Sequence, residues 1–181
     1  MLIRYTTNNF PTEYIPRTDN NCSNYSADVL VDGAKVRLGL WDYANGDDRW
    51  EDRLRALSYY PHTDVHVLVF SLISEGSFNC IEREWLPRVR RHSPTAPLVL
   101  VGTKLDMRGD ETTLRKLAKQ NGSVVSRERG AKLARKWGAV GYRECSAKTG
   151  EGVNEVFETA VRAALQYKND PTQRRKRCVV M

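Results

Sequence analysis

Short apolar runs alternate along the chain with segments in which apolar residues recur every three or four positions. Runs 64–72 and 98–101 are rich in β-branched residues and predict strands buried on both faces of a parallel sheet, and run 140–143 is similarly strand-like. Helical periodicity or helix boundary residues mark segments 77–91, 111–120, 128–137 and 153–165. Strands that alternate with helices in this way predict an α/β fold with a doubly wound, mostly parallel sheet.

A hairpin is predicted before the first of these strands. Residues 26–31 and 36–40 alternate with a period of two around Asp32-Gly33, a strong turn signal, so the two strands should pair antiparallel at one side of the sheet. Residues 1–5 read as part of a further helix.

Three helices carry boundary or packing signals. Ser74 and Pro94 are suitable boundaries for the helix around 77–91, in which Trp85 and Val89 should pack on the sheet. Segment 111–120 has Leu114 and Leu117 on one side and many charges elsewhere, which predicts an exposed helix that ends at Gly122. The last helix should bury a stripe formed by Val153, Val156, Phe157, Ala160, Val161, Ala164 and Leu165.

The loop after strand 98–101 reads Thr103, Lys104, Leu105, Asp106, at the position where open α/β sheets bind ligands. A carboxylate such as that of Asp106 can accept two hydrogen bonds from a ring N–H and an exocyclic amine, which guanine presents on one edge and adenine does not. Lys104 could lay its alkyl stem over a flat ring. Alone, the loop could equally be a solvated one.

A second loop of the same kind follows run 140–143. It reads Ser146, Ala147, Lys148, and its small residues allow backbone N–H groups to approach a ligand and donate to a base oxygen. Two loops at strand ends therefore predict one purine site.

These motifs resemble the Thr/Asn-Lys-x-Asp and Ser-Ala-Lys motifs of the Ras superfamily of small GTPases. Other segments resemble the Rho/Rac branch over nearly the whole chain: Tyr5–Asn8, Glu13–Pro16, Leu38–Asp42, Arg53–Arg55 and Asp110–Gln120. The resemblance implies a P-loop NTPase-like sheet with one antiparallel edge hairpin, binding of GTP or GDP with Mg²⁺, and Rho-type effector and regulator proteins as partners. It also implies a small GTPase domain over residues 1–167, with the insert helix near 111–120.

The resemblance places the first switch loop over residues 10–24, with Tyr14 on the partner surface. A metal-ligating threonine follows the Pro in the family, whereas Arg17 and then Thr18 follow Pro16 in this chain, so Thr18 is a candidate that could be displaced. Asp42 is the residue expected to contact Mg²⁺ through water, and Trp41 is expected on the exchange-factor surface. Plain packing is the alternative for Trp41.

The second switch departs from the family pattern Asp-x-x-Gly-Gln. Asn45 stands in place of the glycine, unless Gly46 takes that place with a shift of one residue. Neither register supplies the glutamine that orients the attacking water, and Asp47 is the one side chain nearby that could accept its hydrogen bond. We therefore expect weak hydrolysis, with no certain catalytic residue.

The 181 residues contain no Gly-x-x-x-x-Gly-Lys-Ser/Thr phosphate loop, which the resemblance places before Met1 together with the first central strand. Losing three charge-assisted hydrogen bonds of about 1.5–3 kcal/mol each would weaken binding by roughly three to six decades. We therefore expect impaired phosphate binding and a marginally stable sheet with its first central strand missing. The alternative is that both elements are encoded upstream.

Composition and charge add a basic tail to this picture. The length allows one domain, the four cysteines have no metal-ligand spacing, and no apolar run could form a leader or a membrane span. The net charge is +7, and more than half of the excess lies in residues 168–177. Cys178-Val179-Val180-Met181 fits a prenylation motif, with farnesyl expected on Cys178. A lipid beside a basic run predicts a cytoplasmic protein that is peripheral to anionic membranes.

Two functions fit these features. One is a guanine-nucleotide switch at membranes; the other is a pseudo-GTPase that competes for effectors or exchange factors without cycling. Nucleic-acid binding is disfavoured because no aromatic residues are interleaved with the arginines of the tail.

Overall fold

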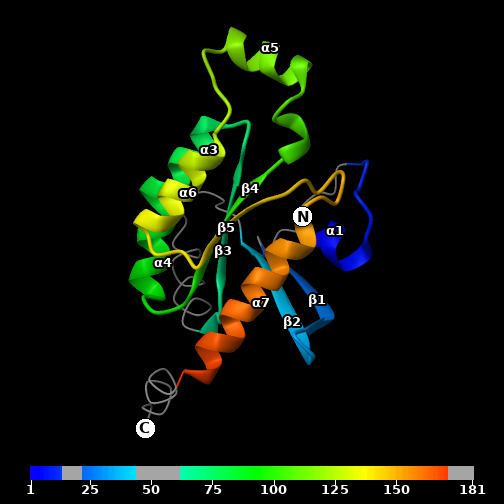
Figure 1. Ribbon diagram of the computed structural model, residues 1–181, viewed down its shortest axis with the longest axis vertical. Coiled ribbons are helices and arrows are strands. Elements are labelled where there is room, and N and C mark those ends of the chain that lie inside the picture. Colours follow the sequence, from blue (N-terminus) through cyan, green and yellow to red (C-terminus); the bar gives the residue numbers. More distant parts are fainter. Residues whose placement is uncertain (14–21, 44–61, 171–181) are drawn as a thin grey trace.

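Two hydrogen-bonded sheets form the framework of the protein. The computed structural model (Figure 1) describes residues 1–13, 22–43 and 62–170. The strands are β1 (Cys22–Val31), β2 (Ala34–Tyr43), β3 (His66–Ser71), β4 (Leu98–Thr103) and β5 (Gly141–Glu144). β1 and β2 pair antiparallel as predicted, and β3, β4 and β5 form a parallel sheet in that order. In the described part of the chain no ladder joins β2 to β3, so the hairpin does not extend the parallel sheet directly.

The helices lie close to the predicted segments. They are α1 (Leu2–Thr7), α3 (Glu75–Cys80), η2 (Ile81–Trp85), α4 (Leu86–His92), η3 (Leu105–Met107), α5 (Glu111–Lys119), α6 (Arg127–Lys136) and α7 (Val153–Asn169). Within the ranges that the structure describes, no helix is both long and apolar enough to cross a membrane.

Helix starts follow from short polar side chains that accept hydrogen bonds from the first turn. Ser74 accepts from the N–H of Ser77 at 3.2 Å, which confirms Ser74 as the start of α3. Asp110 caps α5 and Ser126 caps α6 in the same way. These caps satisfy N–H groups that have no partner within the helix.

Helices α3 and α4 are joined by a π-helical segment that the sequence pattern did not indicate. The N–H of Leu86 donates to the carbonyl of Ile81, five residues back. Pro87 follows directly, and a proline inside a helix lacks an N–H and its ring crowds the carbonyl four residues earlier. The wider turn before Pro87 therefore keeps residues 75–92 as one continuous helical stretch.

The parallel sheet is covered on both faces (Figure 1). On one face the side chains of Phe70, Leu98 and Leu100 pack in a cluster with residues of α3, η2, α4 and α6, including Val89 and, at its edge, Trp85. On the other face Val99 and Val101 pack with residues of α7, and with Leu2, Tyr5 and Leu40 from α1 and β2. The ring of Tyr5 stacks on Phe157 with centroids 3.7 Å apart, which fixes the predicted first helix on α7.

The burial predicted for two elements needs correction. β3 is not buried on both faces, because Val69 is 42% exposed; β3 has β4 on one side, whereas β4 lies between two strands. In α7, Ala163 is buried and the predicted Ala164 and Leu165 are half-buried. Helix α5 is mostly exposed, as predicted: Leu114 is 40% exposed, and Thr113 is its buried residue.

Candidate nucleotide-binding site

The loops that follow β4 and β5 meet, as predicted from their places at neighbouring strand ends. The hydroxyl of Ser146 donates to Oδ1 of Asp106 at 2.6 Å. The N–H of Leu105 donates to the carbonyl of Cys145 at 3.1 Å, so backbone as well as side chains join the two loops. Ser146 is fully buried and Asp106 is half-buried.

Asp106 keeps capacity for a ligand while it is held by Ser146. A carboxylate offers about four lone-pair sites on two oxygens. Within the described residues, Oδ2 of Asp106 accepts no hydrogen bond. The side chain can therefore accept further N–H donors, which is the chemistry required to bind the guanine edge.

Thr103 holds the ends of β3 and β4 together. Its hydroxyl donates to the carbonyl of Phe70 at 2.9 Å, and its own carbonyl accepts from the N–H of Leu72 at 2.9 Å. These bonds tie the ends of β3 and β4 together, so the Thr103 side chain serves the site by fixing the strand from which Lys104 and Asp106 follow.

The two lysines are exposed on these loops. Lys104 has left-handed backbone geometry, with a φ of 63°, at the point where the chain turns from β4 into η3. This conformation is uncommon for a residue with a side chain. Lys148 is exposed on the second loop and Ala147 is half-buried beside it. Both ammonium groups are therefore available to a flat ring or an anionic ligand.

The second loop is a tight turn that is held from several sides. The N–H of Ser146 donates to the carbonyl of Glu151 at 2.8 Å, and the N–H of Thr149 donates to Oγ of Ser146 at 3.1 Å. Gly152 has a φ of 69°, and a Cβ there would lie 2.3 Å from the carbonyl oxygen of Glu144. The turn therefore requires glycine at this position.

A buried ion pair joins the same two segments and was missed in the sequence. Arg108 donates to Glu144 through both terminal nitrogens, at 2.7 and 2.5 Å, and to the carbonyl of Val125 at 3.3 Å. The hydroxyl of Tyr142 donates to Oε1 of Glu144 at 2.7 Å. The side chain of Glu144 is 3% exposed. Its burial acts to raise its pKa, but the bonds from Arg108 and Tyr142 outweigh burial and hold the pKa below the usual value, so Glu144 is ionised.

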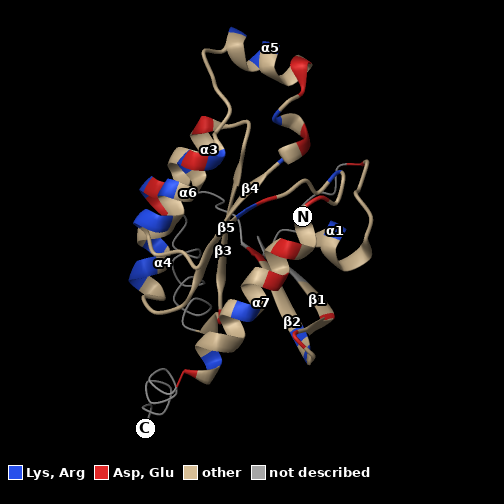
Figure 2. Ribbon diagram, in the orientation of Figure 1, with Lys and Arg blue, Asp and Glu red and all other residues tan. Residues whose placement is uncertain are grey.

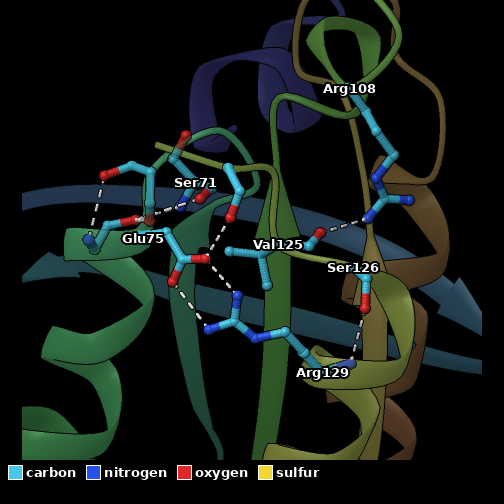
Figure 3. A network of polar contacts seen from close by, with 9 residues as sticks. Ser71, Glu75, Arg108, Val125, Ser126 and Arg129 are labelled. Atoms are coloured by element: carbon cyan, nitrogen blue, oxygen red, sulfur yellow. Dashed lines mark hydrogen bonds and ion pairs between the residues drawn. The ribbon is translucent and has the colours of Figure 1, made fainter. Parts of the chain in front are cut away.

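A second network secures the start of α6 (Figure 3). Glu75 accepts hydrogen bonds from both terminal nitrogens of Arg129 and from the hydroxyl of Ser123. The guanidinium of Arg129 lies 5.1 Å from the ring centroid of Phe78. Bonding to Arg129 lowers the pKa of Glu75. These contacts bind the segment that leads into α6 to the first turn of α3.

Metal and partner candidates are only partly covered by the structure. Trp41 is 53% exposed on β2. Asp42 lies near the terminal amine of Met1, and the pKa of this amine is lowered because its burial outweighs the opposing effects of Cys145 and Asp42. Carboxylate oxygen and water suit Mg²⁺, so Asp42 fits the predicted contact through water. In ranges 1–13, 22–43 and 62–170 no cluster of three or more His, Cys, Asp or Glu residues could hold a metal. The other candidates lie outside the described residues: Tyr14, Thr18, Asn45, Gly46, Asp47 and Cys178.

A cavity of 420 Å³ lies away from the two loops, between the hairpin turn and the end of α7. Asp32 and Arg162 line it and form a bidentate ion pair at 2.9 and 3.1 Å. Because these polar groups satisfy each other, the cavity is a less suitable place for a nucleotide base than the loops at the strand ends.

The fold and these loops define an α/β domain with a polar site at the carboxyl ends of its parallel strands. A family model described as the Ras family matches residues 1–166, and the chain belongs to this family. Ras-family GTPases bind GTP or GDP with Mg²⁺ and act as signalling switches through effector and regulator proteins.

Proposed function

We propose that the protein is a Rho-type guanine-nucleotide-binding switch whose base site is formed by Asp106, Ser146 and Ala147. The observation that carries the proposal is the hydrogen bond between Ser146 and Asp106, which brings the two loops together with an oxygen of Asp106 left for a ligand. Asp106 accepts hydrogen bonds from the ring N–H and the exocyclic amine of guanine, while the backbone N–H of Ala147 donates to the base oxygen. The N–H of Ser146 already donates to the carbonyl of Glu151. Lys104 and Lys148 flank the base.

Assignment to the Rho type is supported by the segment between Asp106 and α6. Helix α5 forms at the predicted insert position and stands apart from the other helices (Figure 1). Its residues are mostly exposed. Trp41 is half-exposed on β2, as a contact for an exchange factor must be.

Phosphate binding and hydrolysis are proposed to be weak in a polypeptide of these 181 residues. The sequence has no Gly-x-x-x-x-Gly-Lys-Ser/Thr motif and no glutamine in the second switch, where Asn45, Gly46 and Asp47 stand instead. Asp47 is the remaining candidate to orient water. Asp42 and Thr18 are the candidates for Mg²⁺.

The tail is proposed to place the protein at the cytoplasmic face of anionic membranes. A farnesyl group on Cys178 would supply one signal, and the basic residues 174–177 would supply the second. Nucleic acid is not the proposed partner, because acidic residues of α3 and η2 lie beside the basic residues of α6 (Figure 2). Lys136 pairs with Glu82, and Arg129 pairs with Glu75.

A non-cycling competitor is the second candidate. The replaced residues of the second switch favour this candidate, because they remove the glutamine that orients the attacking water. A protein that retains the partner surface around Trp41 but does not hydrolyse GTP can stay bound to effectors or exchange factors. Single-turnover GTP hydrolysis separates the two: turnover above the rate in buffer supports the switch, and none supports the competitor.

Base recognition is tested by titrating ¹⁵N-labelled protein with GDP and ADP and following amide shifts. We expect wild type to prefer GDP and Asp106→Ala to lose about tenfold or more of this preference, because two charge-assisted bonds disappear. Asp28→Ala, an exposed carboxylate on β1, is the matched control and should keep the preference. Equal GDP and ADP affinities in wild type would refute the proposed function.

A further inference from the structure

The base loops are the two loops that follow β4 and β5 and are proposed to bind the nucleotide base. They are connected at two levels. The upper level is the Ser146 to Asp106 hydrogen bond. The lower level is the Arg108 to Glu144 ion pair, and each of its residues lies two positions from its partner in the upper level: Arg108 follows Asp106, and Glu144 precedes Ser146. Any change in the distance between Arg108 and Glu144 is therefore passed along two short stretches of backbone to the groups that would contact the base.

The lower connection is rigid. Both oxygens of Glu144 accept from Arg108 in a bidentate arrangement, and Tyr142 occupies a further acceptor position. Bidentate guanidinium–carboxylate pairs fix orientation as well as distance. With Glu144 3% and Arg108 29% exposed, the pair is screened less by salt than a surface pair.

Neighbouring elements hold this connection in place. Arg108 also donates to the carbonyl of Val125, which is fully buried in the segment before α6. The ring of Tyr142 packs so closely on α6 that a Cβ at Gly130 would lie 2.2 Å from Cζ. Arg127 of α6 lies 3.7 Å from Oε2 of Glu144. The ion pair therefore lies between β5, α6 and the loop after β4.

We propose that Arg108, Glu144 and Tyr142 are positioning residues that set the distance between Asp106 and the Ser146-Ala147 backbone and so determine the selectivity of the site for guanine. This rests on the proposed function. None of the three needs to touch the nucleotide; they act through the loops they join. A pair that served stability alone would leave selectivity unchanged in the folded protein.

The experiment compares GDP with IDP, whose base lacks the 2-amino group that would donate a hydrogen bond to Asp106. Affinities of the full 181-residue chain for both are measured by amide-shift titration, with thermal midpoints for each variant. Glu144→Gln keeps the shape of the side chain, Arg108→Lys keeps the charge, and Tyr142→Phe keeps the ring. The matched control is Glu75→Gln, which breaks a bidentate pair with Arg129 outside the base loops.

We expect Glu144→Gln and Arg108→Lys to reduce the GDP/IDP affinity ratio by about threefold or more, and Tyr142→Phe by less, while Glu75→Gln leaves it unchanged. If the amide spectrum of Glu144→Gln is not dispersed, that variant is unfolded. The GDP/IDP affinity ratios of Arg108→Lys and Tyr142→Phe then test the inference. Wild-type ratios in folded Arg108→Lys and Tyr142→Phe would overturn the inference.

The experiments distinguish failure of this inference from failure of the proposed function. If wild type prefers GDP over ADP and Asp106→Ala abolishes that preference, the proposed function stands whatever Arg108 and Glu144 do. If wild type shows no preference, both proposals fall.

Discussion

The hydroxyl of Ser146 lies 2.6 Å from Oδ1 of Asp106, although the two residues are 40 positions apart in the chain. The same hydroxyl accepts the N–H of Thr149, so one buried oxygen joins both loops and closes the turn of the second. Ser146 is therefore the residue through which the turn before α7 is coupled to the carboxylate expected to bind the base.

Ser146→Ala is expected to destabilise the protein by about 1–2 kcal/mol, because it removes a donor to Asp106 and an acceptor for Thr149. It should also lower the GDP/ADP affinity ratio severalfold, since Asp106 loses its anchor. Urea unfolding and amide-shift titration measure the two effects. Ser123→Ala, which removes a hydroxyl bonded to Glu75, should leave the ratio unchanged. A wild-type ratio in Ser146→Ala would contradict this role.

Gly130→Ala is expected to be among the more damaging single-methyl additions in the molecule. Gly130 is buried in α6 and faces the ring of Tyr142, whose Cζ would lie 2.2 Å from the added Cβ. Because both groups are held in the core, the helix or the ring must shift, at a cost of about 1–3 kcal/mol. Urea midpoints measure the loss.

Gly109→Ala provides the comparison for Gly130→Ala, since a Cβ at Gly109 meets nothing within 4 Å. The double variant Gly130→Ala with Tyr142→Leu should recover part of the loss, although it gives up the hydroxyl bond to Glu144. A Gly130→Ala protein as stable as Gly109→Ala would show that the ring of Tyr142 is not fixed.

The elements of the fold and the base loops could be predicted from the sequence because their signals are local. The hairpin turn at Asp32-Gly33, the cap at Ser74 and the strand-end motifs around Asp106 and Ser146 each occupy a few consecutive residues. For these, short-range propensity and tertiary structure agree.

The features that were missed depend on residues distant in the chain. Arg108 and Glu144 are 36 positions apart, and neither carries a pattern that marks its partner. Val69 was expected to be buried because the apolar run reads as a central strand, but its exposure depends on how many strands flank β3. The π-helical turn before Pro87 had one local signal, the proline itself, which predicts a disturbance without specifying its form.

The tail is expected to require both of its membrane signals. Farnesylated protein should bind phosphatidylserine-containing vesicles in a flotation assay, and Cys178→Ser should abolish binding because no lipid is attached. Replacing Arg174, Arg175, Lys176 and Arg177 by glutamine should weaken binding by about 1 kcal/mol per residue. The farnesylated protein should also bind neutral phosphatidylcholine vesicles weakly. Equal binding to neutral and anionic vesicles would show that the basic residues do not contribute.

His66 is expected to make the protein less stable in mild acid. Burial, reinforced by the nearby charge of Arg90, lowers its pKa from 6.5 to about 4. The unfolded chain therefore takes up a proton near pH 6.5, whereas the folded protein resists protonation until about pH 4, so stability falls as the pH is lowered through this window. The loss should reach about 1 kcal/mol by pH 5.5 and about 3 kcal/mol at most.

Urea unfolding at pH 7.5, 6.5 and 5.5 tests this expectation, because it stays above the range in which ordinary carboxylates titrate, and the pKa of Glu144 is lower still. His66→Gln should flatten the dependence on pH, whatever its stability at pH 7.5, because glutamine does not titrate. His62→Gln is the matched control. Since His62 is exposed, this variant should show the same decrease in unfolding free energy with falling pH as wild type. If His66→Gln keeps the wild-type decrease in unfolding free energy with falling pH and His62→Gln loses it, the proton is taken up elsewhere. Burial of His66 then does not govern the stability of the protein in acid.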